Sequence, residues 1–269
     1  MDGFKFHVEI TGNNDGIPVY VFHTSPFDHK YLMKSLQSEG DYSFYFFDLP
    51  NHGGSEPTDL DNLSFMKIAK AVEGYRKSND HQKIHVLGHG IGGFVAQTYA
   101  TRFKNSVHSL VICNSAPNSR YRTEMAWNIR DKLSKVTKQK MSDLQGGTDA
   151  ESLRFRFQSS LPAYFSDEFQ SQADDLIDGL DVFPSDSYVT ISNYMIPKYD
   201  VRDGLQGFHH PVLIIIGTHD VWPENILEHY KIDVPHAKII KIDSGHFPMI
   251  EQPVQFWNAV LAFLDENSK

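Results

Sequence analysis

Short runs of apolar, often β-branched residues recur along the chain and are separated by longer amphipathic stretches. Each run is apolar almost throughout, without polar residues at every second position, which is typical of strands in a parallel sheet that is covered on both faces. The pattern predicts six such strands, at residues 19–23, 44–47, 84–87, 110–113, 212–216 and 239–242.

Helices are predicted between these strands. The stretches at 63–76, 91–102, 224–230 and 254–264 have this character, and the last has its apolar residues at helical spacing. An alternating β-α order implies right-handed crossovers. The chain is therefore predicted to have an α/β fold built on a mostly parallel, doubly wound sheet.

The β-α rhythm stops between Asn118 and Pro197, where a charged, partly amphipathic stretch takes over. Helices are predicted there at residues 125–136, 151–158 and 167–180, with turns at 146–148 and 184–186. We interpret residues 118–197 as a helical cap inserted into a core of residues 1–117 and 198–269. Its aromatic residues either line a pocket or pack the cap itself: Tyr121, Trp127, Phe155, Phe157, Tyr164, Phe165 and Tyr194.

Composition limits the partners of the chain. Its 269 residues carry a formal net charge of -9, which argues against nucleic acid and anionic membranes, because both require a basic surface. A small neutral or cationic molecule is the expected ligand, and the pattern leaves the oligomeric state open. Met1 to Lys5 do not begin a leader peptide, and no run approaches the roughly 20 apolar residues of a membrane span. A cytoplasmic location is expected.

Neither a metal nor a cofactor is predicted. The single cysteine, Cys113, lies within an apolar strand and is expected to be a buried, unreactive thiol. His85 and His89 lie four residues apart but on a strand and turn, and His209 and His210 are adjacent. No carboxylate cluster completes a ligand set for either pair.

Recognisable residues follow several of the predicted strands, at the edge where open parallel sheets bind ligands. Gly88-His89-Gly90-Ile91-Gly92-Gly93 joins a strand to a helix and resembles the G-H-S-x-G-G nucleophile elbow of α/β-hydrolases, with Gly90 in place of the serine. Residues 48–55 are similar to the family's D-x-P-G-H-G-x-S turn, with Asn51 replacing a glycine. Asparagine tolerates the left-handed conformation that such a turn needs.

Three further segments carry the same resemblance. Gly217-Thr218-His219-Asp220 looks like the strand end that supplies the triad acid, and residues 244–253 match the G-H-x-P-x-x-E-x-P loop that supplies the triad histidine. His23-Thr24-Ser25-Pro26-Phe27 stands where the family has an H-G-G-P-G or H-G-x-x loop, and it looks most like the prolyl-aminopeptidase branch. Apart from the cap, the resemblance covers nearly the whole chain.

The resemblance implies a role for five residues. His246 would be the base and Asp220 would fix its tautomer. The N–H groups of Ser25 and Ile91 would form the oxyanion hole, and Gly90 would mark the vacated nucleophile position. The implied substrate is a small ester or amide, including peptide-like ones.

Three explanations of Gly90 stay open. It could be an engineered or variant substitution in a serine hydrolase, in which case Gly90→Ser should restore labelling by a fluorophosphonate. The protein could instead use His246 as a general base without a nucleophile, as cofactor-free lyases and dioxygenases of similar fold do. It could also be a ligand-binding pseudoenzyme. His89, Ser25 and Ser115 are the substitute nucleophiles weighed, each with a structural role as the more common alternative.

Overall fold

The protein is built on one seven-stranded sheet, described by a computed structural model over residues 4–37, 40–143 and 149–268. The strand order is β1-β3-β2-β4-β5-β6-β7. β1 pairs antiparallel with β3, and all other pairings are parallel. The six predicted strands are confirmed, and the bounds of all seven are β1 Val8–Gly12, β2 Ile17–Phe22, β3 Tyr42–Phe47, β4 Ile84–His89, β5 Val107–Cys113, β6 Val212–Gly217 and β7 Lys238–Ile242.

β1 is the strand that the hydrophobic pattern did not predict. Its residues Val-Glu-Ile-Thr-Gly alternate in polarity, and the strand lies at the edge of the sheet with none of its residues buried. Such a strand needs only one apolar face. A search for continuously apolar runs therefore passes over it.

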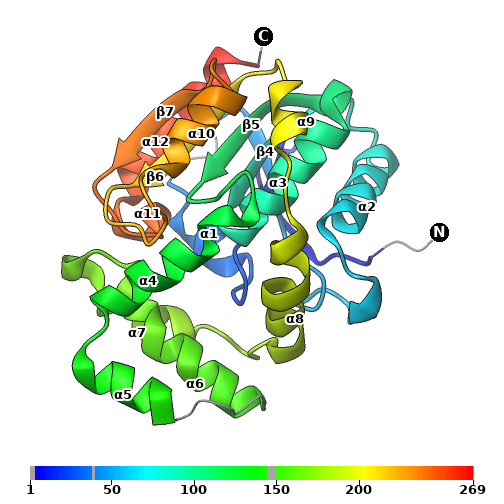
Figure 1. Cartoon of the computed structure of the whole chain (residues 1–269). Helices are drawn as coiled ribbons and strands as arrows, with labels where there is room; N and C mark the ends of the chain where they lie inside the picture. The colour runs from blue at the N-terminus through cyan, green and yellow to red at the C-terminus, as the bar shows by residue number, and fades with distance from the viewer. Residues whose placement is uncertain (1–3, 38–39, 144–148, 269) are drawn as a thin grey trace.

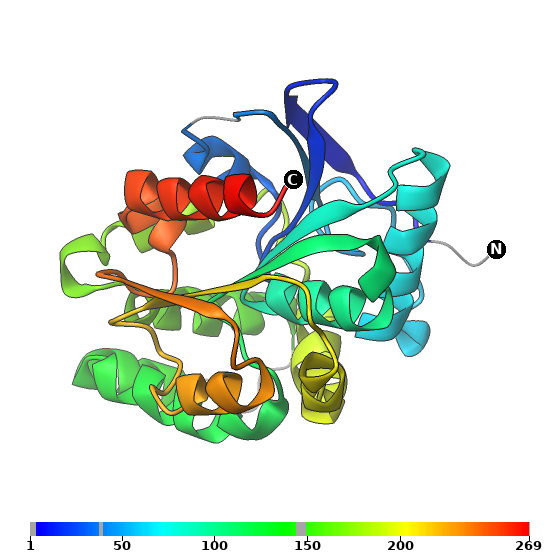
Figure 2. The ribbon, with the colours of Figure 1, turned by 90° about the horizontal axis from the view of Figure 1, so that it is seen from above.

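Helices cover both faces of the sheet, because successive strand residues point to opposite sides. Ile214 of β6 packs into the core with α2, α3 and α10, whereas its neighbour Ile215 packs into the core with α1 and α12. Figure 2 shows these two helical layers on either side of the sheet. The helices are α1 Lys30–Ser35, α2 Phe65–Ser78, α3 Ile91–Arg102, α10 Ile226–Asp233, α11 Pro248–Glu251 and α12 Pro253–Glu266.

The segment between β5 and β6 is helical, and we call it the helical insertion. Figure 1 shows α4 to α8 together beyond one end of the sheet, with α9 returning beside α3. Its helices are α4 Arg122–Lys132, α5 Lys135–Asp143, α6 Ala150–Ser160, α7 Gln172–Asp178, α8 Ser185–Thr190 and α9 Arg202–Gln206. Short 3-10 turns lie at Leu60–Asn62, Lys104–Ser106, Ser119–Tyr121, Leu161–Tyr164, Asp167–Phe169 and Ile196–Lys198. A single π turn lies at Ile191–Met195 among the described residues.

The expected helices of the insertion differ from the observed ones in detail. The helix expected at 125–136 is two helices, since α4 ends at Lys132 and α5 begins at Lys135. The helix expected at 167–180 is a 3-10 turn followed by α7. The turn expected at 184–186 is wrong in part, because Pro184 caps α8 and the next residues are helical. The turn expected at 146–148 lies outside the described residues.

No helix in the described ranges is long and apolar enough to cross a membrane. Residues 1–3 of the N-terminal segment weighed as a leader lie outside those ranges.

Candidate active site

Gly90 lies in a sharp turn between β4 and α3, as the elbow motif predicts. Its backbone has φ 54° and ψ -115°, a region that costs glycine little and strains residues with a side chain. The turn is tight, since a Cβ placed on Gly92 would lie 2.1 Å from the carbonyl oxygen of Phe22. Gly90 therefore stands at the carboxyl edge of the central strands, where a nucleophile would project from this turn.

His246 and Asp220 lie together beside this turn. Nδ1 of His246 donates a hydrogen bond to Oδ1 of Asp220 at 2.9 Å, and both side chains are almost fully buried. That bond leaves Nε2 as the ring atom with the free lone pair. Nε2 lies 3.1 Å from the point where a Cβ on Gly90 would be. Nε2 of His246 thus faces the position where the elbow of the resembled family carries its serine.

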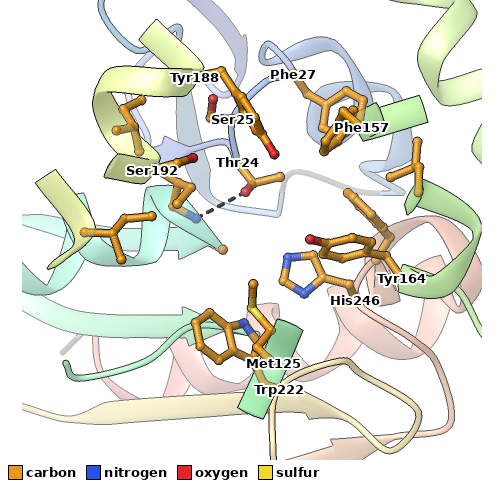
Figure 3. A pocket seen from close by; sticks show the side chains of 16 residues that line it. Thr24, Ser25, Phe27, Met125, Phe157, Tyr164, Tyr188, Ser192, Trp222 and His246 are labelled. Atoms are coloured by element: carbon orange, nitrogen blue, oxygen red, sulfur yellow. Dashed lines mark hydrogen bonds between the residues drawn. The ribbon is translucent and has the colours of Figure 1, made fainter. Parts of the chain in front are cut away.

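Thr24 occupies the other side of the same point. A Cβ on Gly90 would lie 2.4 Å from Oγ1 of Thr24 and 2.9 Å from its Cβ, which is too close for unshifted atoms. The backbone N–H of Ile91, expected as an oxyanion donor, donates instead to Oγ1 of Thr24 at 3.2 Å. Figure 3 shows this bond as a dashed line, with His246 across the cavity. The sequence-based expectation is that Gly90→Ser restores labelling of a serine hydrolase. In this structure the new serine would also collide with Thr24 unless atoms shift.

The substitute hydroxyls are engaged elsewhere. Nδ1 of His52 donates to the carbonyl of Pro50, so Oγ of Ser25 donates to Nε2 of His52, at 2.8 Å. Oγ of Ser115 donates to the carbonyl oxygen of Gly90 at 2.8 Å. Ser25 does line the cavity, as the predicted oxyanion role requires. Neither hydroxyl forms a hydrogen bond with His246.

Both ring nitrogens of His89 form hydrogen bonds inside the protein. Its Nδ1 lies 2.6 Å from the hydroxyl of Tyr31, and its Nε2 lies 2.7 Å from the carbonyl oxygen of His246. Nε2 must donate to that carbonyl, so Nδ1 accepts from Tyr31. Burial, aided by the charge of His246, lowers the pKa of His89 well below its usual value. His89 therefore remains neutral and fixes the loop that carries His246.

A cavity of about 110 Å³ opens above the elbow, between the sheet and the helical insertion. Among the described residues, no Asp, Glu, Lys or Arg side chain lines it. Seven aromatic residues of the insertion were named from the sequence. Of these, Phe157 and Tyr164 line the cavity, Tyr121 and Phe165 are buried elsewhere, and Trp127, Phe155 and Tyr194 are exposed. Figure 3 shows how the lining side chains surround the space; they include Phe27, Met125, Phe157, Leu161, Tyr188, Ile191, Ser192, Trp222 and Phe247.

The helical insertion is hydrogen-bonded to both of the loops that carry His246 and Asp220. The N–H of His246 donates to the carbonyl of Tyr164. On the acid loop, the side chain of Asn128 donates to the carbonyl of Val221 at 3.0 Å, and Lys132 donates to the carbonyl of His219. The insertion, which supplies part of the cavity wall, thus also holds the loops of His246 and Asp220.

Within the part of the chain that the structure describes, the histidine pairs named from the sequence do not belong to a cluster of three metal-binding donors. His85 bonds the hydroxyls of Ser109 and Ser268. Cys113 is fully buried, and burial raises the pKa of its thiol well above the usual value. One other group of donors does come together in the described chain, His7 with Glu9 and His29, away from the cavity.

Comparisons with known proteins point to one family. The family model described as alpha/beta hydrolase fold matches residues 16–253. A proline iminopeptidase of Flavobacterium johnsoniae is 25% identical over 98% of this chain and 94% of its own length. A pimeloyl-[acyl-carrier protein] methyl ester esterase of Nitrosomonas europaea is 24% identical over 94% of this chain and 96% of its own length.

Among solved structures, a thermophilic esterase from Thermogutta terrifontis superposes with a TM-score of 0.80 at 19% identity, covering 99% of this chain and 95% of that one. At that identity the likeness concerns the fold. The family match spans far more than half of the sequence and includes the elbow and the strand that precedes Asp220. The chain is therefore a member of the α/β-hydrolase family, similar to its proline iminopeptidases and esterases.

Proposed function

We propose that this protein binds a small neutral ester or amide above Gly90 and that His246, oriented by Asp220, acts on it as a general base without forming an acyl-enzyme. The observation that carries the proposal is the direction of His246. Its Nε2 lies 3.1 Å from the empty Cβ position of Gly90 and faces the cavity. A base so placed can take a proton from a water molecule or from the ligand itself.

At the elbow, Gly90 supplies no nucleophile for covalent catalysis. Gly90 has no hydroxyl, the hydroxyls of Ser25 and Ser115 are engaged with His52 and the Gly90 carbonyl, and Cys113 is buried in β5. Direct attack by water leaves the histidine and acid in their usual roles and dispenses with the serine. Removal of a proton next to a carbonyl, as in a lyase, would use the same base.

The lining of the cavity favours a neutral ligand over a peptide with a free amino terminus. An aminopeptidase substrate carries a positive charge, and a buried charge requires a partner of opposite sign. The described residues that line the cavity offer hydroxyls, aromatic rings and His246 but no carboxylate. We therefore place this chain nearer to esterases than to aminopeptidases in the chemistry of its ligand.

The second candidate is a ligand-binding protein without turnover. It is favoured by the hydrogen bond from Ile91 to Thr24, which occupies a donor that an oxyanion would need. In both candidates residues 118–197 act as a cap over the core formed by 1–117 and 198–269, because the insertion supplies much of the cavity wall.

Hydrolysis of an activated ester such as p-nitrophenyl acetate separates the two. A general-base enzyme should show turnover without an initial burst, and His246→Gln should lower the rate on the order of 10²-fold. His236→Gln is the matched control, since His236 is an exposed histidine outside the cavity. If His246→Gln and the unaltered protein hydrolyse the ester at equal rates and still bind it, His246 is not a general base. The ligand-binding candidate would then stand.

A further inference from the structure

We infer that Thr24 and Gly90 are an exchanged pair, in which the hydroxyl side chain has moved from the elbow to the facing loop and closes the oxyanion hole. The family pattern that residues 23–27 resemble has glycine where Thr24 stands, and the elbow pattern has serine where Gly90 stands. In this chain the hydroxyl residue, Thr24, is in the loop, and the glycine, Gly90, is at the elbow. The inference builds on the proposed function and concerns the same cavity.

Sterics link the two positions. With Thr24 present, a side chain on Gly90 would begin 2.9 Å from the Cβ of Thr24 and 2.4 Å from its Oγ1. Rotation of Thr24 about χ1 can move its oxygen but not its Cβ. Gly90 also has φ 54°, so a serine there would carry backbone strain in addition. A lone serine-to-glycine change in an ordinary hydrolase would not account for the threonine that fills the space.

Hydrogen bonding holds Thr24 in this place. Its Oγ1 accepts from the N–H of Ile91 at 3.2 Å, and its own N–H donates to the hydroxyl of Tyr31 at 3.0 Å. Tyr31 in turn donates to His89, which bonds the carbonyl of His246. Thr24 is 5% exposed and lines the cavity. It is a specificity-determining residue that keeps the Ile91 donor from a ligand oxygen.

Fluorophosphonate labelling of four proteins tests the exchange. Labelling joins the serine oxygen to phosphorus, expels fluoride and passes the hydroxyl proton to Nε2 of His246. We expect Thr24→Gly/Gly90→Ser to label about tenfold faster or more than Gly90→Ser alone. Thr24→Gly alone should not label at position 90. Thr24→Val/Gly90→Ser should stay as slow as Gly90→Ser, because valine keeps the bulk of threonine.

Two results would overturn the exchange. One is equal labelling of Gly90→Ser and the Thr24→Gly double variant. The other is a folded double variant that does not label. The amide signal of Ile91 is an independent readout, since Thr24→Val removes its acceptor and should shift that proton upfield; an unmoved signal also counts against the inference. The His246→Gln ester assay is unaffected by these results, so failure of the proposed function is seen separately.

A second, independent inference concerns a surface site for a divalent transition metal: the geometry points to His7, Glu9 and His29 as its ligands. One donor atom from each residue lies within 4.8 Å of the others. His7 and Glu9 are two residues apart along the edge of the sheet, so their side chains share a face, and Nε2 of His7 lies 3.1 Å from Oε1 of Glu9. Two imidazoles and one carboxylate suit zinc or cobalt.

Asp48 orients the ring of His29 towards the proposed metal position. It is completely buried, and its Oδ1 accepts from Nδ1 of His29 at 2.9 Å. A carboxylate on the far side of a histidine fixes the tautomer and leaves Nε2 as the metal-binding atom, as in many zinc sites. The rings of His7 and His29 have centroids 5.2 Å apart. Metal bonds of about 2.1 Å require the three groups to close slightly.

Calorimetric titration with Zn²⁺ after removal of bound metal tests this site. One equivalent should bind, and His7→Gln and Glu9→Gln should each weaken binding about tenfold or more. His209→Gln is the matched control, because His209 is an exposed histidine far along the chain and outside the cluster. Equal affinity in the His7→Gln protein, or no stoichiometric binding, would mean an adventitious ion only and would end the assignment.

Discussion

Oδ1 of Asp220 lies 2.9 Å from Nδ1 of His246, while Oδ2 of the same carboxylate is buried without a hydrogen-bond partner among the described residues. Oδ1 also accepts the N–H of Val221 at 2.6 Å. Oδ1 therefore orients the ring, and Oδ2 adds no bond that would turn the carboxylate away from it. In the function we propose, this carboxylate would stabilise the imidazolium formed when His246 takes a proton.

Asp220→Asn should therefore abolish most base activity while the fold persists. An asparagine amide in this place favours the wrong tautomer, and loss of the carboxylate in a related triad costs about 10⁴-fold in rate. We expect ester turnover to fall about 10²-fold or more. The free energy of unfolding should stay within about 1 kcal/mol of that of the unaltered protein. Stopped-flow rates and urea unfolding measure the two. Unimpaired turnover would show that the pair does not act in catalysis.

Tyr31→Phe should destabilise the protein by about 1–3 kcal/mol. The change leaves the buried Nδ1 of His89 and the N–H of Thr24 without the Tyr31 hydroxyl. Tyr45→Phe is the control, since the Tyr45 hydroxyl makes a longer, half-buried bond to His81 at 3.2 Å. Urea unfolding at neutral pH compares the two. Equal losses would show that the Tyr31 network is no tighter than a surface contact.

His85 should make stability depend on pH. Burial, with the nearby charge of His108, lowers the pKa of His85 from 6.5 to about 3. The unfolded chain binds this proton more readily, so the stabilisation is complete above pH 6.5 and is lost as the pH falls towards 3. The largest slope from one such group is about 1.4 kcal/mol per pH unit.

Replacement of His85 by asparagine should flatten the slope between pH 6.5 and 4, as followed by urea unfolding. The groups that face His85 are the stacked ring of His108, the ring of Tyr42 and the hydroxyls of Ser109 and Ser268. An unaltered slope would place the acid sensitivity in other groups.

Gly217→Ala should damage the site without touching the base. A Cβ there would lie 2.0 Å from the carbonyl oxygen of Gly245, so the loop that carries His246 must move. We expect a loss of stability of about 1–3 kcal/mol and lower ester turnover. Gly74→Ala is the control: it lies inside α2 with nothing within 4 Å, and should stabilise by about 0.5–1 kcal/mol. Opposite signs in thermal unfolding are the expected result.

The sheet was predictable because most of its strands contain a run of apolar residues. β2 to β6 lie inside the sheet and are largely buried, and the edge strand β7 still contains the pair Ile239-Ile240 between its lysines. The other edge strand, β1, alternates in polarity and was not predicted. The insertion was harder to predict. The break between α4 and α5 falls within one amphipathic stretch, with no glycine or proline to mark it.

Within the site, motifs located His246, Asp220 and the elbow, because each stands at a fixed distance from a strand end. Thr24 was overlooked as a functional residue, although the loss of glycine from its loop was visible. Its importance comes from contact with Gly90, 66 residues along the chain by the numbering of the sequence. The periodicity of hydrophobic residues describes single helices and strands. It does not show which residues of two separate loops contact each other.

The helical insertion is bonded to the His246 loop through Tyr164 and to the acid loop through Asn128 and Lys132. Two side chains of α4 thus hold the backbone on either side of Asp220, while the carbonyl of Tyr164 holds the backbone of His246. The spacing of the imidazole and the carboxylate therefore depends on a segment that belongs to neither strand end, and a substitution on α4 would alter their alignment without contacting either side chain.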